Sequence, residues 1–483
     1  MSRSTLIVLG STFSILILIS LLLLCLQPPI FRSYVIKMTK LATDSAIMKQ
    51  WQEPSVPIVI QFYFFNLSNP SEYLNGSKPV MKQLGPYTYR ERRSKGNIER
   101  NDSASTISYL EMKHYFFVPD ESAGSESDLI TNINLVYLTL AVQEEQHSKF
   151  ITYLLEALCH KFGEELLVQR PVYDWLWGYE DSLLRFLKSI AFPINSTRVG
   201  LFTNANNTAT GPFVIDSGLF NFESLGHILA FNGQTSLNVW TTSDANMLNG
   251  SDGSIFHPFI GPDEPLYVFA SDLCRSIKFV PRDKVLVHGI PTWKYLPLED
   301  TFDSPKSNPK NRGFCPRWPV CFEDGVLDMS TCQPGPPIAI SMPHFASPVY
   351  QDAVEGLHPS AEFNTTFHIE PTTGVVVDIA RKLQVNVNVT RNEKFVQMSK
   401  LHTALVPLMF LNESASLDEQ TASTLRRFVV ILPLCIQIIA IVLLCISVPM
   451  VLLLLGFFVR LVRRTRTAAS ELEQPLISEP VLL

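Results

Sequence analysis

Four cysteines in a stretch rich in proline and glycine show the spacing that most clearly indicates a specific chemistry. Cys274, Cys315, Cys321 and Cys332 lie close together in the sequence, and Cys159 stands apart. In an oxidising compartment such a cluster predicts two disulfide bonds that hold a loop-rich region together. Cys315 and Cys321 enclose a short loop and are natural partners, which would leave Cys274 for Cys332, but all three possible connectivities remain open. A zinc site is the competing interpretation, which the absence of a Cys-x-x-Cys motif disfavours.

Asparagines that could carry N-linked glycans form the second chemical pattern. All of the Asn-x-Ser/Thr sequons fall in the middle of the chain, and such sequons are glycosylated only in a lumenal or extracellular compartment. The sequon asparagines are Asn66, Asn75, Asn101, Asn195, Asn206, Asn249, Asn364, Asn388 and Asn412. Their density predicts a heavily glycosylated middle region on the non-cytoplasmic side of a membrane.

The common local motifs of catalysis are missing from the sequence. It contains no Gly-x-Ser-x-Gly, no His-Glu-x-x-His, no phosphate-binding glycine loop and no dinucleotide fingerprint, and its 10 histidines are scattered singly. We therefore expect no enzymatic activity, no cofactor and no metal site. The net charge of -6 gives no reason to expect nucleic acid as a partner.

Two uncharged apolar runs bracket these residues and must position them. The runs are Thr5 to Leu26 and Phe428 to Val459, and each is long enough to cross a bilayer as a helix, which takes roughly 20 residues. No Ala-x-Ala-like cleavage site follows the first run, which favours an uncleaved anchor over a signal peptide. The predicted segments are a tail at 1–4, a membrane helix at 5–26, an ectodomain at 27–427, a second membrane helix at 428–459 and a tail at 460–483.

Positive charge predicts which side of the membrane each segment occupies. Arg3 precedes the first run, and Arg460, Arg463, Arg464 and Arg466 follow the second. Basic residues at the ends of membrane helices favour the cytoplasm. Both termini are therefore expected to be cytoplasmic, in agreement with the sequons on the opposite side.

Strand patterns dominate the predicted ectodomain. In Gly374 to Val389 apolar residues alternate with Gln384, Asn386 and Asn388, which predicts a half-buried strand with the sequon Asn388 on its wet face. Ile58 to Phe65, Leu266 to Ala270 and Leu129 to Val142 are further strand candidates. Helical character concentrates between residues 144 and 191: Ile151, Leu154, Leu155 and Leu158 recur at helical spacing, and Asp181 to Ala191 reads as a second helix. The pattern indicates a β body that carries a helical excursion.

Several ordered motifs, together with the two anchors, resemble the class B scavenger receptor family. The motifs are Tyr63-Phe64-Phe65-Asn66-Leu67-Ser68-Asn69-Pro70, Gly85-Pro86-Tyr87-Thr88-Tyr89-Arg90, Leu176-Trp177-Gly178-Tyr179, Gly313-Phe314-Cys315, Ile340-Ser341-Met342-Pro343-His344-Phe345 and Glu355-Gly356-Leu357-His358-Pro359. The resemblance extends over nearly the whole chain.

This resemblance implies a fold class and a way of handling lipids. The fold would be α+β, with a large antiparallel β-barrel-like ectodomain, a helical bundle at its membrane-distal end and two transmembrane helices. The function implied is a non-enzymatic receptor that binds cholesterol, fatty acids, phospholipids or lipoproteins and conducts lipid through a tunnel to the membrane. Such a conduit would spare an apolar chain the cost of crossing water, about 0.8 kcal/mol per CH₂.

The resemblance also places candidate ligand-binding residues in the helical segment. A lysosomal member of the family, whose paired cysteines match Cys274/Cys332 and Cys315/Cys321, binds a lysosomal hydrolase there through a contact that a histidine makes pH-sensitive. The corresponding candidates in this chain are Lys149, Phe150, Lys161, His147 and His160. A cargo receptor for a hydrolase is therefore the alternative to lipid transport, and many glutamates around Lys161 disfavour a polyanion site.

The C-terminal tail resembles a sorting signal. Glu471 and Glu473 precede Leu476 and Ile477, an arrangement close to an acidic dileucine motif, although the acids stand one residue away from the usual place. The motif predicts sorting adaptors as partners and a location in the lysosomal or endosomal membrane or in the plasma membrane.

Overall fold

The structure is a computed structural model that describes residues 3–43, 45–54, 56–142, 149–194 and 196–472. Its contacts divide the chain into two compact units. The terminal unit contains Met1–Lys37 and Gln420–Leu483, and the central unit contains Met38–Glu419. Each unit is described by itself.

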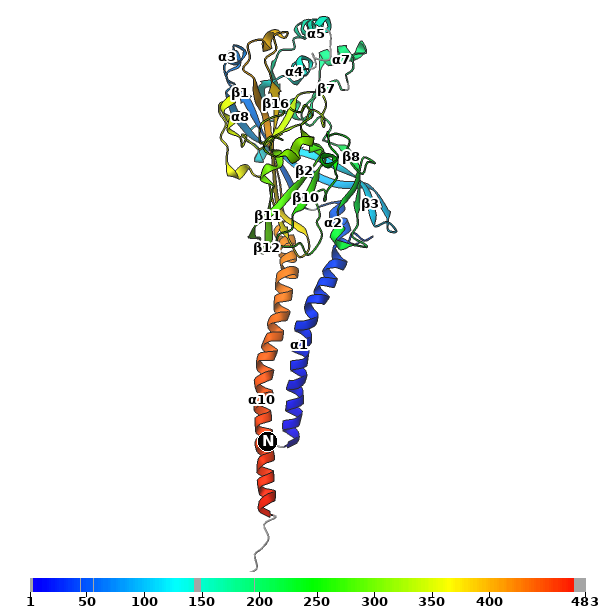
Figure 1. The fold of residues 1–483 in the computed structure, drawn as a ribbon, viewed down its shortest axis with the longest axis vertical. Helices are drawn as coiled ribbons and strands as arrows, with labels where there is room; N and C mark the ends of the chain where they lie inside the picture. Colours follow the sequence, from blue (N-terminus) through cyan, green and yellow to red (C-terminus); the bar gives the residue numbers. More distant parts are fainter. Residues whose placement is uncertain (1–2, 44, 55, 143–148, 195, 473–483) are drawn as a thin grey trace, which may run out of the picture. The chain divides into compact units, whose positions relative to one another are not determined.

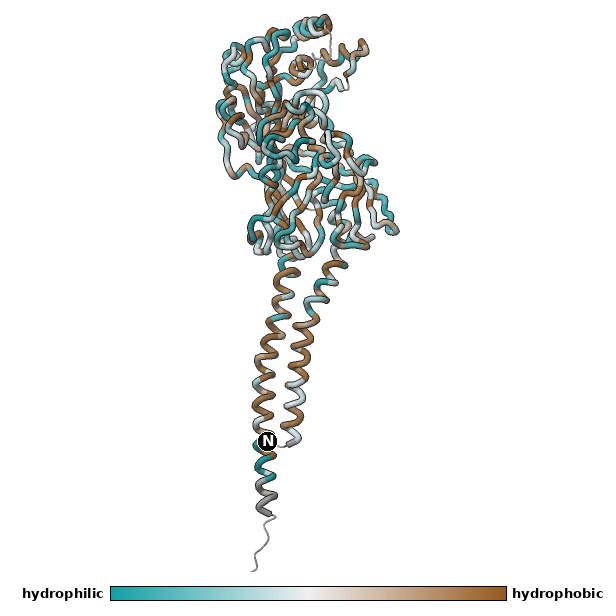
Figure 2. The backbone as a smooth tube through the Cα atoms, viewed as in Figure 1, coloured by the Kyte–Doolittle hydropathy of each residue, from teal (hydrophilic) through white to brown (hydrophobic). Residues whose placement is uncertain are grey.

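Long apolar helices make up the terminal unit. Helix α1 spans Arg3–Thr39, and the second helical run consists of α9 (Glu419–Arg426), a π-helical turn η10 (Arg427–Ile431) and α10 (Leu432–Leu472). Both are long and apolar enough to cross a membrane, as their hydropathy shows in Figure 2. They extend beyond the predicted apolar runs, and the ring of Phe428 contacts the rings of Phe31 and Tyr34 at 5.3 and 5.8 Å.

Antiparallel strands form the body of the central unit (Figure 1). The 13-stranded sheet follows the order β10-β11-β12-β15-β16-β17-β1-β2-β3-β8-β9; off this path β14 pairs with β16, and β13 pairs with β14. Two small sheets pair β4 with β5 and β6 with β7. The strands are β1 (Ile58–Leu67), β2 (Met81–Asn101), β3 (Thr106–Phe117), β4 (Leu129–Ile133), β5 (Leu167–Pro171), β6 (Tyr179–Glu180), β7 (Arg198–Val199), β8 (Thr208–Asp216), β9 (Ile228–Phe231), β10 (Leu266–Ala270), β11 (Arg275–Val287), β12 (Ile290–Pro297), β13 (Val326–Asp328), β14 (Ile338–Ser341), β15 (Thr366–Glu370), β16 (Val375–Val389) and β17 (Ala404–Ser416).

A short segment brings the two edges of this sheet together into a nearly closed barrel. Ile228 on β9 donates its amide to the carbonyl of Gly250, and Ser251 exchanges backbone hydrogen bonds with Tyr267 and Phe269 on β10. Gly250 has a φ of +75°, and a Cβ there would lie 1.9 Å from the carbonyl oxygen of Tyr267. Only glycine therefore permits the close approach that seals the barrel at this position.

Short helices gather at one end of the central unit, opposite the β11–β12 hairpin (Figure 1). The helices of the central unit are α2 (Ala46–Gln52), α3 (Pro70–Leu74), α4 (Leu135–Val142), α5 (Lys149–Phe162), α6 (Val172–Trp177), α7 (Ser182–Ser189) and α8 (Pro348–Ala353). We call α4, α5 and α7 the helical end. The predicted α+β class with a β-barrel-like body and a helical bundle is confirmed.

Local sequence explains where the two principal helices begin and end. Gly163, with a φ of +74°, terminates α5, and the chain then enters β5 at Leu167. Asp181 caps α7, because its Oδ1 accepts the amide of Leu184 at 2.8 Å. The predicted helix at Asp181 to Ala191 is thus confirmed as α7.

Three predicted strands and one predicted helical face agree with the structure only in part. Ile58 to Phe65 lies in β1 and Leu266 to Ala270 is β10, as predicted. The prediction of one strand from Leu129 to Val142 is wrong beyond Ile133, because the apolar residues after Asn134 form helix α4. On α5, Leu155 is buried, but Leu154 is exposed rather than part of the buried face.

Two amides that alternate with the apolar residues of β16, on the same side as Asn388, are not exposed to solvent. Gln384 and Asn386 are fully buried, and Asn388 is half-buried. Gln384 Nε2 donates to Asn386 Oδ1 at 2.7 Å, and Asn386 Nδ2 donates to Ser341 Oγ at 3.0 Å. The amide of His344 donates to Gln384 Oε1 at 2.6 Å. The segment after β14 covers this face of β16, and the buried amides form a hydrogen-bonded polar network beneath it. Alternation of polar residues along the strand therefore did not indicate exposure to solvent.

Two disulfide bonds hold the cysteine-rich region. Cys274 is bonded to Cys332 and Cys315 to Cys321, so that these cysteines are not zinc ligands. Cys159 is a free, buried thiol on α5, and burial raises its pKa to about 12. It therefore stays a protonated, unreactive side chain at physiological pH.

An aromatic core joins the helical end to the barrel. The ring of Trp177 on α6 lies 5.3 Å from that of Tyr89 on β2 and 5.1 Å from that of Tyr115 on β3. Phe62 on β1 contacts both Tyr89 and Trp177 through its edge. The helices are therefore anchored on the strands by large buried rings, which favour such edge-to-face contacts.

Asn132 on β4 ties two strands of the barrel together where their pairing ends. Its Nδ2 donates to the carbonyls of Phe65 on β1, at 2.6 Å, and Pro407 on β17, at 3.1 Å. We expect Asn132→Ala to destabilise the fold by about 1–3 kcal/mol, because two buried carbonyls lose their donor. Urea unfolding of the solubilised chain, followed by tryptophan fluorescence, measures this. Gln169→Ala on the exposed neighbouring strand is the control, and equal stability of the two variants would contradict the role of Asn132.

Candidate functional site

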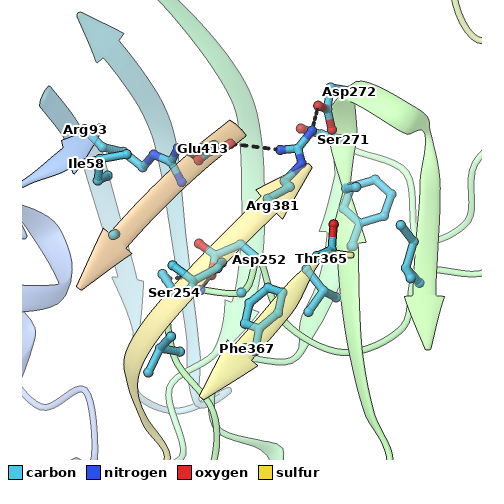
Figure 3. A pocket seen from close by; sticks show the side chains of 18 of the residues that line it. Ile58, Arg93, Asp252, Ser254, Ser271, Asp272, Thr365, Phe367, Arg381 and Glu413 are labelled. Atoms are coloured by element: carbon cyan, nitrogen blue, oxygen red, sulfur yellow. Dashed lines mark hydrogen bonds and ion pairs between the residues drawn. The ribbon is translucent and has the colours of Figure 1, made fainter. Parts of the chain in front are cut away.

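The barrel encloses a cavity with two chemically different walls (Figure 3). Its volume is about 250 Å³. One wall is apolar and comes mainly from β10, β11, β15 and β16, with Val268, Ile277, Phe279, Phe367 and Val377. The other wall carries charged side chains from β2, β3, β16 and β17 together with Asp252 and Asp272. The cavity therefore offers one apolar and one ionic surface to whatever enters it.

Charged residues on the ionic wall form a chain of contacts that crosses the barrel. Arg93 on β2 contacts Glu91 and Glu413, each at 2.6 Å, and Arg381 on β16 contacts Glu413 at 3.4 Å and also pairs with Asp272. Figure 3 shows Arg93, Glu413, Arg381 and Asp272 in one line. A single carboxylate thus links two strands that are separated by β17 and β1 in the sheet.

A second group of charges continues the ionic wall from β2. Lys95 Nζ lies 3.3 Å from Asp252 Oδ2 and 3.1 Å from Ser254 Oγ. The hydroxyl of Tyr109 donates to the same Asp252 oxygen at 2.7 Å, and the ammonium of Lys95 lies 4.7 Å from the ring centre of Trp51. Lys95 is 2% exposed, so this pairing compensates a fully buried cation.

Together these residues form what we call the ion-pair network. Its members are Glu91, Arg93, Lys95, Glu111, Lys113, Asp252, Asp272, Arg381 and Glu413. Four cations face five carboxylates, and each cation has at least one carboxylate partner. A site whose charges nearly cancel favours no strongly charged ligand, whereas an amphiphile could place its polar part against the network and its apolar part against the opposite wall.

The pKa values of two carboxyl groups show how strongly the cations act. Burial alone would raise the pKa of Glu413, but Arg93 and Arg381 outweigh it and lower that pKa to about 2. Burial would likewise raise the pKa of Asp252, but the charge of Lys95 opposes this effect, and the pKa of Asp252 is also lowered to about 2. Both groups therefore remain ionised at neutral and at mildly acidic pH. In the described residues no cluster of histidine, cysteine or carboxylate side chains is arranged to hold a metal ion.

The side chains of the ion-pair network differ in their exposure to solvent, and this difference identifies the part of the network that a ligand would meet. The side chains of Asp272 and Arg381 are 50% and 24% exposed, whereas Lys95 and Glu91 are almost fully enclosed. Asp272 lies in the 3₁₀ turn η5 (Ser271–Leu273), next to the Cys274–Cys332 bridge. The pair Asp272–Arg381 is therefore the accessible end of the network.

Helix α5 presents a second candidate surface at the helical end. Phe150, Tyr153 and Leu154 are exposed by 76%, 62% and 47%, and Lys161 is exposed on the same face. Their spacing of three, four and seven or eight residues places them in one stripe along the helix. Apolar side chains exposed side by side are typical of a surface that a partner covers. We call Phe150, Tyr153 and Leu154 the α5 stripe.

The structure separates the ligand-binding residues predicted from the sequence. Lys149 and Phe150 lie at the start of α5, and His160 and Lys161 lie at its end, about 16 Å further along the axis. All four are exposed. His147 lies outside the described residues. The sequence did not reveal the ion-pair network, because the alternation Glu91, Arg93, Lys95 reads equally well as a solvent-facing strand.

The sequon asparagines differ in access. Asn75, Asn101 and Asn364 are exposed, and five others are half-buried: Asn66, Asn206, Asn249, Asn388 and Asn412. The amide nitrogen of Asn412 already donates to Gln61 Oε1 at 3.1 Å. Asn195 lies outside the described residues, as do Glu473, Leu476 and Ile477 of the tail motif, and Glu471 lies in the last turn of α10.

Comparisons with known proteins point to one family. The model of the CD36 family matches residues 10–458 of the chain. Lysosome membrane protein 2 of Homo sapiens is 38% identical over 417 residues, which cover 85% of this chain and 84% of the relative. The same protein of Rattus norvegicus is 36% identical over 427 residues, with 87% and 86% covered. Scavenger receptor class B member 1 of Sus scrofa is 32% identical over 438 residues, with 89% and 85% covered.

Removing one charge from the centre of the ion-pair network should destabilise the barrel. We expect Glu413→Gln to lower the free energy of unfolding by roughly 2–4 kcal/mol, because Arg93 and Arg381 lose their shared buried partner. The stabilisation by Glu413 is present above its unfolded pKa of about 4.5 and is lost as the pH falls toward about 2. Unfolding of wild type and variant between pH 7 and pH 3 measures both effects.

Glu121→Gln is the matched control for this variant. Glu121 pairs with Arg90 at 2.8 Å, but both side chains are exposed, so its loss should change stability by less than about 1 kcal/mol. A Glu413→Gln protein that is as stable as Glu121→Gln would contradict the central role of Glu413.

Proposed function

The chain belongs to the CD36 family, and we propose on that premise that it is a receptor that binds lipids and conducts them through its barrel to the membrane. Capture would occur at the helical end, and passage would follow the barrel cavity. Cholesterol, fatty acids, phospholipids and lipoproteins are the candidate ligands. The name of one group of relatives, scavenger receptor class B member 1, describes a receptor and supports binding rather than catalysis.

The observation that carries this proposal is the two-walled cavity. A lipid is an amphiphile, and the apolar wall with Phe279 and Phe367 can receive its hydrocarbon part while the network receives its polar part. Removing apolar area from water supplies about 25 cal/mol per Å². An enclosed site with few polar contacts that fix orientation is the usual form of a small-molecule site.

The location of the receptor follows from the same reasoning. The two apolar helices support an integral membrane protein with cytoplasmic termini, a tail at 1–4, membrane helices at 5–26 and 428–459, a glycosylated ectodomain at 27–427 and a tail at 460–483. Relatives named lysosome membrane protein 2 favour the lysosomal or endosomal membrane, with the plasma membrane as the second candidate. Sorting adaptors would bind the C-terminal tail.

Filling the cavity should block lipid transfer. Ile379 on β16 lines the cavity, and we expect Ile379→Trp to reduce uptake of labelled cholesterol and phosphatidylcholine to about a fifth or less, because the large ring occupies the ligand volume. Cells that express the full chain provide the measurement, normalised to the amount of folded protein at the membrane.

Ala380→Trp is the matched control on the same strand. Successive side chains of a strand point to opposite faces, so that Ala380 faces away from the cavity. Uptake that stays unchanged in Ile379→Trp, with normal abundance of the protein, would remove the conduit from consideration. An equal loss in both variants would assign the effect to misfolding.

A second function is favoured by the α5 stripe. The chain could carry a soluble lysosomal hydrolase, which would dock on Phe150, Tyr153 and Leu154. Exposed aromatic residues anchor many protein interfaces, because they bury a large area at low cost in side-chain entropy. This function and lipid transfer use different regions of the central unit and do not exclude each other.

Charge placed in the stripe should abolish such docking. We expect the double variant Phe150→Asp/Tyr153→Asp to weaken binding of a purified lysosomal hydrolase by about tenfold or more, which corresponds to ~1.4 kcal/mol. Biolayer interferometry with a panel of purified hydrolases at pH 7.4 and pH 5.0 measures it. Leu229→Asp, at an exposed apolar residue of β9, is the control. The cargo function is contradicted if no hydrolase binds the wild-type chain, or if binding survives in the double variant.

A further inference from the structure

Two acidic side chains meet where the helices of the helical end join. Glu164 follows the C-terminus of α5, where its amide donates to the carbonyl of Cys159 at 2.8 Å. Asp181 is the N-cap of α7. The carboxyl groups of the two residues lie within hydrogen-bonding reach of each other. The rings of Phe162 on α5 and Phe186 on α7 also pack, at 5.2 Å between centroids, so the junction of the two helices has an apolar contact as well.

The hydrogen bonds of this pair are complete only with a proton. Asp181 is 1% exposed, and its Oδ2 is buried without a donor among the described residues. Its Oδ1 is occupied by the amide of Leu184, and Glu164 Oε2 accepts from Asn134 Nδ2 at 2.7 Å. Two carboxylates cannot hydrogen-bond to each other, whereas a protonated Glu164 can donate to Asp181 Oδ2 and satisfy that buried oxygen.

The charges around the pair do not replace this proton. Arg170 on β5 is the cation that faces Glu164, but its guanidinium stacks on the ring of Tyr179 at 4.0 Å, and its Nε is buried without an acceptor among the described residues. Tyr179 on β6 faces both acids. From α5, Cys159 faces both acids as a protonated thiol, and Glu156 adds negative charge near that thiol. Asn134, just before α4, is a neutral donor to Glu164, as the amide of Leu184 is to Asp181.

The balance of these groups favours the protonated form. Burial is the largest cause, and with Asp181 it outweighs Asn134 and Arg170 and raises the pKa of Glu164 to about 7. A carboxyl whose folded pKa lies above its unfolded pKa binds its proton more tightly in the folded state. It contributes stability that is greatest at acidic pH and is lost as the pH rises from about 4.5 through about 7.

We propose that Glu164 and Asp181 form an acid-closed latch that holds α5 against α7 at acidic pH and loosens their junction at neutral pH. Protonated Glu164 donates to Asp181 and completes the cap of α7. Ionised Glu164 repels Asp181 and leaves a buried oxygen without a donor. The α5 stripe lies on the helix that this latch holds, so a ligand of the stripe would meet a firmer surface in an acidic compartment; that last link alone rests on the proposed function.

Hydrogen exchange measures the latch directly and without any ligand. We expect the amides of α5 and α7 in the full solubilised chain to be about tenfold or more better protected at pH 5.0 than at pH 7.5, after correction for the intrinsic pH dependence of exchange. In Glu164→Gln the side-chain amide donates to Asp181 at every pH, so protection should be high and independent of pH. Asp181→Asn should abolish the pH dependence too, since its amide can donate to Glu164.

Glu165→Gln is the matched control, because Glu165 is the adjacent acid and is exposed. It should keep the pH dependence of the wild type. Equal protection of wild type at both pH values, persistence of the pH dependence in Asp181→Asn, or its loss in Glu165→Gln would each overturn the latch. Should Glu164→Gln fail to fold, Asp181→Asn decides the question. Lipid uptake and hydrolase binding are measured separately, so their failure is distinguishable from failure of the latch.

Discussion

The pairing of charges inside the barrel is the constraint on which the rest of the central unit depends. Glu91, Arg93 and Lys95 occupy alternate positions of β2 and all point inward, where an unpaired charge would be very costly. Their partners lie on β3 and β17 and in the segment that holds Asp252, and Glu413 connects them to Arg381 on β16 and through it to Asp272. A slip of one residue in any of these strands would move its charges to the outer face and leave the others unpaired. The network therefore fixes the register of the strands that shape the cavity.

Hydrophobic packing fixes the other end of the barrel. Above the ionic wall the strands are filled by Phe62, Tyr89 and Tyr115, on which Trp177 of α6 rests. The helical end is thereby attached through α6 and through the amide of Asn132, while α5 and α7 themselves contact the core with only one side. This arrangement leaves the outer face of α5 free to carry exposed apolar residues and confines the acidic pair to the one junction between the helices.

Much of this architecture could be predicted from local sequence. The two apolar runs, the strand at β16 and the capped helix α7 each follow from composition or periodicity, and a resemblance built on ordered motifs supplied the barrel and the helical bundle. Burial of Gln384 and Asn386 could not be predicted, because the segment that covers them is distant in sequence. The same limit applies to the site: Glu413 and Arg93 are separated by most of the chain, and Glu164 looked like one acid among several until Asp181 was seen beside it.

Sharing one carboxylate between two arginines has a consequence for how the family can diverge. Replacing Glu413 removes one partner from both arginines at once and leaves them with Glu91 and Asp272, and replacing either arginine leaves Glu413 with a single cation. Mutational drift at these positions is thus expected to be slow and to proceed by paired exchanges. The α5 stripe has no such linkage, since its side chains touch solvent, so substitutions on the outer face of α5 can accumulate independently of the interior of the barrel.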